Sequence, residues 1–348
     1  MSALAELLDA RPWLLADGAT GSNLFDMGLQ SGDAPELWNL ERPRDIADLH
    51  RRFIDAGADI VLTNSFGGNR QRLRLHGAAA DVAAINQAAA RIARAEVARS
   101  GRTVLVAGSI GPTGDILAPL GATDPARARE AFAEQAQALK SGGVDLLWIE
   151  TMSSREEVLA ALEGAASAGL PMVCTMSFDT NGRTMMGVTP ADLAALSADA
   201  DPALAACGAN CGVGPSEVVA CVLNLARAAA PGAVLVAKAN CGIPQWIDGR
   251  IRYDGTAELM GDYARLAVDS GARIVGGCCG TTPEHLRAMT QALASHQRGA
   301  PPDMNTVVAR LGDISSGAAA QGRGEMSRAA GAAPGAATES RRRRRTQP

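Results

Sequence analysis

Eight short apolar runs recur along the chain at intervals of roughly 27 to 46 residues, and helical patterns lie between them. Most of these runs are apolar throughout rather than alternating, which is typical of parallel strands buried on both faces. Such strands, each followed by a helix, predict an α/β protein built as a (β/α)₈ TIM barrel. A doubly wound open sheet is the alternative, but no Gly-x-Gly-x-x-Gly turn follows a run. The runs are Trp13–Ala16, Asp59–Thr63, Thr103–Gly108, Val144–Glu150, Pro171–Ser177, Ala203–Asn210, Ala233–Asn240 and Arg273–Gly277.

Charge and hydropathy argue against two classes of partner. Residues 1–12 lack the basic-then-apolar pattern of a signal peptide, and no apolar run approaches the ~20 residues that span a bilayer. We therefore expect a soluble cytoplasmic enzyme with no membrane partner. Residues 314–348 carry seven Arg and two Glu, so the formal net charge of −4 leaves about −9 on the rest of the chain. A mildly acidic body argues against nucleic acid as the main partner.

The last segment differs in composition from everything before it. Ser315–Pro348 is rich in Ala, Gly, Ser and Arg and has no apolar period, which predicts disorder. We expect a barrel domain over residues 1–313 and a disordered Ala/Gly/Arg-rich tail over residues 314–348. The run Arg341–Arg345 could bind an acidic partner, but a solvated tail is the favoured interpretation.

Glycine and polar residues collect where the predicted strands end, which is the catalytic edge of a barrel. The first such stretch, Asp17–Gly21, follows strand one, and Glu150 closes strand four. The others are Thr63–Gly68, Gly108–Pro112, Ser177–Asp179, Asn210-Cys211, Asn240-Cys241 and Cys278-Cys279.

Three cysteines at these strand ends predict a metal site. Cys211 follows strand six, and Cys278 and Cys279 follow strand eight. Thiolates favour Zn²⁺, and three protein ligands leave a fourth position open. Adjacent cysteines reach one ion only if the strand breaks, which Gly277 and Gly280 permit. A redox disulfide or three small core residues are the alternatives. In the reducing cytosol that we expect for this chain, its seven cysteines do not indicate a disulfide framework.

Together these stretches resemble the homocysteine S-methyltransferase family, the zinc-dependent barrel of betaine–homocysteine methyltransferases and of the homocysteine module of cobalamin-dependent methionine synthase. The resemblance covers roughly Trp13–Ala294. It implies that Cys211, Cys278 and Cys279 bind Zn²⁺, while Asp17, Gly18 and Glu150 contact homocysteine. Its carriers are Asp17–Gly21, Ala56–Ile60, Thr63–Phe66, Gly108–Pro112, Glu150-Thr151, Gly208–Cys211 and Gly276–Gly280.

The resemblance also implies how the reaction proceeds. A free thiol has a pKa of about 8.5, and zinc coordination deprotonates it and fixes it in place. The nucleophile is then the zinc-activated substrate thiol, and no further catalytic side chain is expected. Cys241 follows strand seven between the two zinc-bearing strands, and we expect it to be a bystander.

The methyl donor is open between two classes. A quaternary ammonium such as betaine is usually recognised by aromatic faces, yet aromatics are only 3% of this chain and Gly67 stands where betaine-using animal enzymes carry a tyrosine. Trp38, Phe66 and Trp246 could form a smaller cage. We favour betaine or a related onium compound. The alternative is a stand-alone homocysteine module that takes methyl from methylcobalamin on a partner protein.

Two other functions need weighing against this one. Gly276-Gly277 and the helix start at Thr282-Pro283 could bind a phosphate, as in aldolase-like barrels or isomerases, with Lys238 as the candidate lysine. That interpretation explains none of the three cysteines. A non-catalytic zinc scaffold is weakened by the open fourth ligand position. The sequence leaves a homo-oligomer open.

Overall fold

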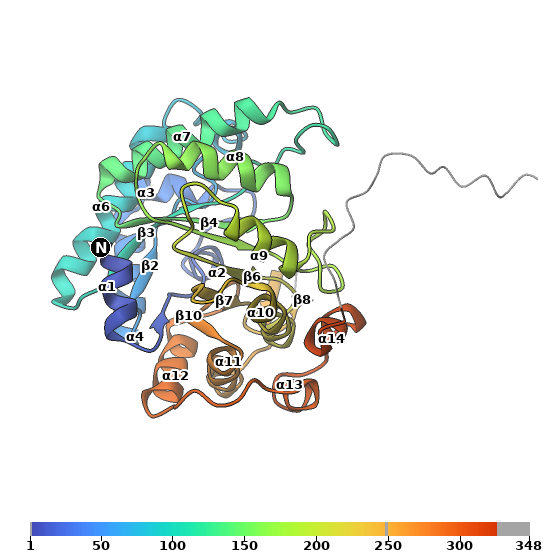
Figure 1. The fold of residues 1–348 in the computed structure, drawn as a ribbon. Helices are drawn as coiled ribbons and strands as arrows, with labels where there is room; N and C mark the ends of the chain where they lie inside the picture. Colours follow the sequence, from blue (N-terminus) through green and yellow to red (C-terminus); the bar gives the residue numbers. More distant parts are fainter. Residues whose placement is uncertain (1, 248–249, 326–348) are drawn as a thin grey trace, which may run out of the picture.

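A computed structural model describes residues 2–247 and 250–325. Its main sheet has eight parallel strands in the order β1-β10-β7-β6-β5-β4-β3-β2. A parallel bridge between Ala16 and Ile60 joins the two end strands into a nearly closed barrel, which confirms the predicted fold (Figure 1). The strands are β1 (Leu14–Leu15), β2 (Ile60–Leu62), β3 (Leu105–Ile110), β4 (Leu146–Met152), β5 (Met172–Met176), β6 (Ala206–Cys211), β7 (Leu235–Ala239) and β10 (Ala272–Gly277).

The helices that ring these strands begin and end at the residues their sequence dictates. In α7, Asp124 caps the first turn by accepting from Ala126 N–H, Pro125 takes the first position, and Gly143 ends the helix with φ 96°. The ring consists of α4 (Pro43–Ala56), α6 (Val82–Ser100), α7 (Pro125–Gly142), α8 (Arg155–Ala166), α9 (Pro190–Ala198), α10 (Pro215–Ala228), α11 (Ala257–Asp269) and α12 (Pro283–Ala294). Shorter helices occupy the loops after β1 and β2, namely α2 (Gly21–Asp26), η1 (Pro35–Leu37), α3 (Trp38–Glu41) and α5 (Arg70–Arg74).

Both faces of the strands are buried, as the continuous apolar runs predict. Alternate residues such as Ile60, Leu62 and Trp148 fill the interior of the barrel, where α1 (Ala3–Ala10) adds Leu4 and Leu8. The residues between them form a second, larger core against the helices. The barrel interior is therefore a packed core, and chemistry is confined to the strand ends.

Two short strands were not predicted. β8 (Pro244–Ile247) and β9 (Arg250–Tyr253) form an antiparallel hairpin in the connection between β7 and α11. Each strand has only four residues, too few for the period of two to stand out from the flanking loop.

The predicted disorder from Ile314 onward is wrong for residues 314–325. After α13 (Met304–Leu311), α14 (Ser316–Arg323) packs against α10, and Ala318 is fully buried. Arg227 Nη1 donates to Gln321 O at 2.7 Å, and Ser315 N–H donates to Glu217 Oε1 at 2.7 Å. Small Ala and Gly side chains let the helix approach closely without an apolar stripe. Residues 326–348, with the Arg341–Arg345 run, lie outside the described residues.

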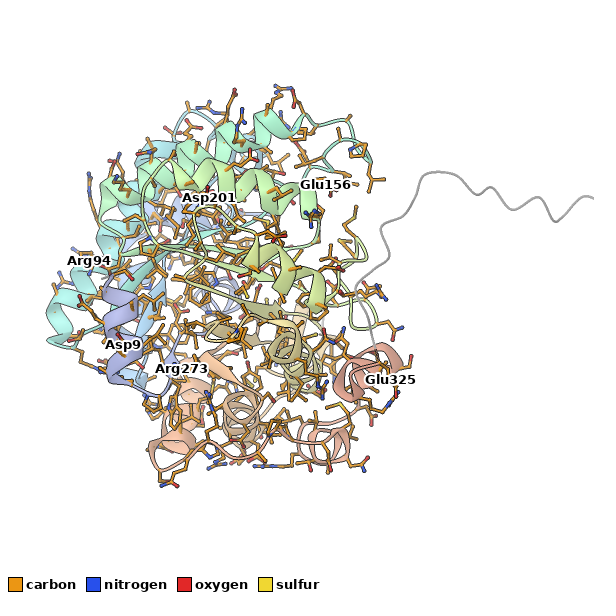
Figure 2. All side chains as sticks on the ribbon, in the orientation of Figure 1. Asp9, Arg94, Glu156, Asp201, Arg273 and Glu325 are labelled. Carbon is orange, nitrogen blue, oxygen red and sulfur yellow. The ribbon has the colours of Figure 1, made fainter. Side chains whose placement is uncertain are left out.

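The outside of the molecule is polar. In Figure 2 the labelled acidic side chains Asp9 and Glu325 lie at different edges of the protein. Among the helices in the described part of the chain, none is both long and apolar enough to cross a membrane.

Candidate metal and substrate site

Three thiols converge where β6 and β10 end. Cys211 is the last residue of β6, and Cys278 and Cys279 follow β10; β7 lies between these strands and pairs with both. The three sulfur atoms lie within 4.8 Å of one another, and the Sγ atoms of Cys211 and Cys279 are 3.9 Å apart. Tetrahedral zinc with Zn–S bonds of about 2.3 Å separates its sulfurs by about 3.8 Å. The cluster therefore fits a zinc ion.

Regular strand geometry ends after β10, and the change in backbone direction there turns both adjacent cysteines toward one point. Cys278 N–H still donates to Ala239 O of β7 at 2.6 Å, whereas Cys279 N–H donates to the side chain of Asn240 at 3.1 Å. Gly280 then takes φ 77°, and a Cβ there would lie 2.3 Å from Tyr253 Cγ. Position 280 therefore requires glycine for two reasons: its φ is positive, and the Tyr253 ring leaves no room for a side chain.

Asn210 ties the thiols to the end of β4. Its side chain accepts from Thr151 N–H at 2.8 Å, donates to Thr151 Oγ1 at 2.7 Å and lies 3.8 Å from Cys278 Sγ. Thr151 and Cys211 have φ 60° and 61°, in the left-handed region that L-residues rarely adopt. Backbone strain of this kind concentrates at functional sites.

Proximity makes the three thiols unequal. Hydrogen bonds to Cys278 and Cys279 raise the pKa of Cys211, while hydrogen bonds from Cys211 and Cys278 lower the pKa of the Cys279 thiol. The set thus favours one thiolate, because further negative charges would repel it. A divalent cation would favour release of the remaining protons.

The other cysteines stand apart from this cluster. The thiol of Cys241 donates to Gly255 O at 3.4 Å and is buried. It does not belong to the group of sulfurs that could share an ion among the described residues. Cys174, Cys207 and Cys221 are buried in the core. The expected bystander role of Cys241 agrees with this placement.

A cavity of about 340 Å³ opens above the thiols. Gly18 and Glu150 line it, together with Cys211, Cys278 and Cys279. Asp17 is not part of the lining: it is 2% exposed, and its carboxylate accepts from Lys238 Nζ at 2.9 Å and from Leu62 N–H at 2.7 Å. The structure therefore brings five of the six predicted site residues together around the cavity and places Asp17 beneath it.

Lys238 is the residue whose role here sequence reasoning missed. It lies 2% exposed on β7, lines the cavity and pairs with Asp17. Burial by itself would lower its pKa, but Asp17 and Glu150 outweigh burial and raise it. A charged lysine held by a carboxylate is not the neutral amine that Schiff-base chemistry needs, which argues against the aldolase interpretation. The sequence signal that could have revealed this role is a lysine inside an otherwise apolar strand.

Glu150 is poised between charged and neutral forms. Burial raises its pKa to about 7, against the opposing effects of Lys238 and of the hydrogen bond from Ser109 Oγ; the neighbouring Cys278 raises it further. A bound cation would stabilise the charged form of a carboxylate in this position, because the cation compensates for the lost hydration.

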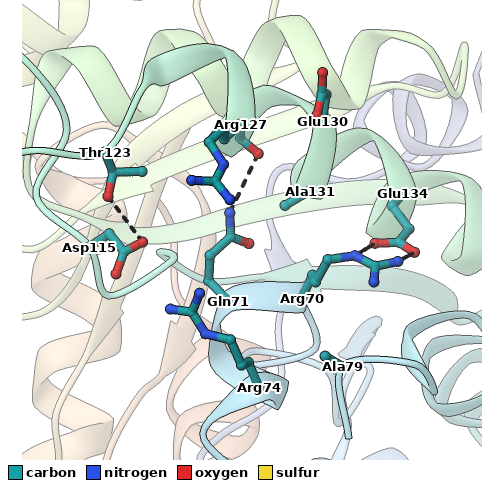
Figure 3. A pocket seen from close by; sticks show the side chains of 10 residues that line it. All are labelled: Arg70, Gln71, Arg74, Ala79, Asp115, Thr123, Arg127, Glu130, Ala131 and Glu134. Carbon is teal, nitrogen blue, oxygen red and sulfur yellow. Dashed lines mark hydrogen bonds and ion pairs between the residues drawn. The ribbon is translucent and has the colours of Figure 1, made fainter.

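A larger hollow of about 700 Å³ lies elsewhere, between α5 and α7 (Figure 3). Its charged side chains are partly paired with one another: Arg70 forms a two-bond ion pair with Glu134, and Thr123 donates to Asp115 at 3.2 Å. None of its lining residues is a cysteine. It offers no set of groups comparable to the thiol cavity.

The sequence is similar to a family of known proteins. The model of the homocysteine S-methyltransferase family matches residues 14–293. The chain is 31% identical over 310 residues to a methionine synthase from Mycobacterium leprae, which covers 83% of this chain and 25% of that protein. A methionine synthase from Mycobacterium tuberculosis is 32% identical over 305 residues, with 82% and 25% covered. The chain thus spans about a quarter of the length of these relatives.

A solved structure resembles the whole barrel. The homocysteine methyltransferase MmuM from Escherichia coli, in its oxidized form, superposes with a TM-score of 0.68 at 27% identity, covering 84% of this chain and 99% of that chain. Its metallated form gives a TM-score of 0.67 at 27% identity, with 83% and 99% covered.

Proposed function

The chain belongs to the homocysteine S-methyltransferase family, and on that premise we propose that it methylates the sulfur of homocysteine to form methionine, with Zn²⁺ held by Cys211, Cys278 and Cys279. The observation that carries the proposal is the convergence of these three sulfurs, within 4.8 Å of one another, on the wall of one cavity. The metallated structure of MmuM supports a metal in this family.

The bound zinc would supply one thing, a lowered pKa for the substrate thiol, so that the sulfur stays ionised at neutral pH. The sulfur lone pair forms the new bond to the methyl carbon. The bond from that carbon to the donor breaks, and its electron pair stays on the donor's leaving atom. The thiol proton has already left to solvent, so charge balances with an onium donor that departs as a neutral amine or sulfide.

The protein's own groups position the substrate. Glu150 would accept the substrate ammonium, which compensates the burial of its carboxylate, and Gly18 allows close approach of the backbone beside it. Asp17 was expected to contact homocysteine directly. Its pairing with Lys238 supports a role one step removed, in which Asp17 holds Lys238 and Lys238 faces the cavity.

We propose betaine or a related onium compound as the donor. Of the two expected cage aromatics whose side chains the structure describes, Phe66 lines the cavity and Trp38 does not. Trp38 is buried under the Arg42 guanidinium, 3.7 Å from its ring centre, and the Trp246 side chain lies outside the described residues. Of the described side chains expected to form the cage, Phe66 is therefore the one placed to meet an onium group.

A second donor class has its own support. The methionine synthase relatives are about four times as long as the part this chain matches. This chain would then act as the homocysteine-binding part of a larger system, with methyl delivered from methylcobalamin on a partner protein.

Methionine formation tests the function directly. Purified protein is incubated with homocysteine and, in separate reactions, betaine, a sulfonium donor or methylcobalamin, and methionine is quantified. We expect methionine with an onium donor. Methionine with methylcobalamin alone would select the second donor class, and none with any donor would reject the proposed function.

A further inference from the structure

The wall of the thiol cavity carries a second set of charged groups, which are not among the proposed homocysteine contacts. Glu36, on η1, and Arg72, on α5, both line the cavity, as does His76. They belong to the loops after β1 and β2, whereas the thiols follow β6 and β10. One cavity thus has a sulfur end and a charged outer wall.

Glu36 is buried where a surface carboxylate would normally be hydrated. Glu36 is only 5% exposed, and its Oε1 accepts a hydrogen bond from Gly67 N–H at 2.6 Å. Burial raises its pKa, while Gly67 N–H, Arg72 and His76 oppose that rise. The exposed Asp33, the other carboxylate on this wall, is partnered by Gln30 N–H at 3.2 Å. Glu36 is therefore the buried negative group of the outer wall.

Gly67 explains why this carboxylate has room. A Cβ at position 67 would lie 3.0 Å from Glu36 Oε1 and 3.3 Å from its Cδ. A large side chain there would compete with Glu36 for the same space. Gly67 and the buried Glu36 carboxylate thus belong to one feature of the cavity wall.

Arg72 supplies the opposite charge without neutralising Glu36. Within residues 2–247 and 250–325, its guanidinium forms no ion pair or hydrogen bond, although it lies close enough to Glu36 to influence the pKa of that carboxyl. Its backbone N–H is held by Asn69 Oδ1 at 3.0 Å, which fixes the start of α5. A carboxylate and a guanidinium whose residues line one cavity without pairing match a ligand that carries both charges.

We propose that Glu36 and Arg72 form the subsite for the charged end of a zwitterionic methyl donor, with Glu36 facing its cationic group and Arg72 its carboxylate. This inference rests on the proposed function and narrows its donor to a small methylonium compound that bears a carboxylate. N-methylammonium and S-methylsulfonium carboxylates share that chemistry. The methyl group would then point toward the sulfur end of the cavity.

Steady-state kinetics of Glu36→Gln separate this role from a structural one. The amide keeps an acceptor for Gly67 N–H and removes only the charge. We expect the KM for betaine, or for the S-methylsulfonium derivative of methionine, to rise about tenfold or more, as loss of a charge-assisted contact predicts. The KM for homocysteine and the zinc content should not change. Glu41→Gln, an exposed carboxylate on the neighbouring helix, is the matched control.

Arg72→Gln tests the group proposed to bind the carboxylate of the donor. It should raise the KM for carboxylate-bearing donors and leave that for trimethylsulfonium, which has no carboxylate, unchanged. Arg74→Gln, an exposed arginine on the same helix, should alter neither. An unchanged donor KM in both Glu36→Gln and Arg72→Gln would overturn the subsite.

Direct binding keeps this result distinct from failure of the proposed function. Calorimetric titration of betaine and of the sulfonium into wild type, Glu36→Gln and Arg72→Gln needs no turnover. Binding to wild type that weakens in both variants supports the subsite even if no methionine forms. No binding to wild type, or turnover with methylcobalamin alone, overturns it.

Discussion

Buried charges set the character of the site at the scale of single residues. Asp17, Lys238 and Glu150 lie at the base of the cavity, each less than a tenth exposed. Buried ions are costly unless each finds a partner. Lys238 satisfies Asp17 at 2.9 Å, which leaves Glu150 as the carboxylate available to a substrate ammonium.

Glu150→Gln should weaken homocysteine binding about 10- to 150-fold, the loss expected for one charge-assisted hydrogen bond. Zinc content should not change, because Glu150 is not one of the thiol ligands. Homocysteine titration and metal analysis on the same samples measure both, with Glu156→Gln on α8 as the control. Loss of zinc with unaltered homocysteine affinity would instead place Glu150 in the metal's surroundings.

His50 should make stability depend on pH. It is buried on α4, its Nε2 has no partner among the described residues, and burial lowers its pKa from 6.5 to about 4, against the pull of Asp17. The unfolded chain therefore binds one more proton between pH 6.5 and 4. Stability should fall as pH falls through that window, by up to about 3 kcal/mol from this group.

The measurement compares unfolding free energies of wild type and His50→Gln from pH 7 to 4. The difference between them isolates His50 from buried carboxyls such as Glu150, whose raised pKa acts in the opposite direction. We expect the variant to lose less stability than wild type on acidification. Parallel curves for wild type and His50→Gln would show that His50 does not titrate as described.

At the scale of elements, the sequence predicted what depends on local composition. All eight barrel strands fall on the predicted apolar runs, since strands buried on both faces are apolar throughout. The β8–β9 hairpin and α14 were missed because their small or mixed side chains carry no period. Contacts between distant residues were also beyond reach: Lys238 and Asp17 are 221 positions apart, and Glu36 meets Gly67 only once the loops after β1 and β2 are folded.

Truncation tests the role of α14. A chain ending at Glu325 should melt at the same temperature as the full chain. A chain ending at Gly312 should melt a few degrees lower, at ~2 °C for each kcal/mol of stability lost. In that chain, Arg227 and Glu217 of α10 lose their hydrogen bonds to Gln321 and Ser315, and α10 loses its packing against α14. Equal melting temperatures for both truncations would mean that α14 contributes nothing to the barrel.

At the scale of the whole molecule, closure of the barrel assembles the site. Its parts lie in or after β1, β2, β4, β6, β7 and β10, which are far apart in the sequence and are brought together only by the closed sheet. The three cysteines could be named from the sequence because their residue type and strand-end positions were both visible there. The charged base of the cavity and its outer wall required the fold.

The central claim is that Cys211, Cys278 and Cys279 hold a metal that serves the substrate thiol. The most direct measurement is zinc per chain in wild type, Cys211→Ala, Cys278→Ala and Cys207→Ala. Cys207 lies on the same strand as Cys211, is equally a cysteine, and is buried in the core. The account predicts one zinc in wild type and in Cys207→Ala, and none bound tightly in the other two, with methionine formation lost in step. Zinc and activity retained in Cys211→Ala or Cys278→Ala would contradict it.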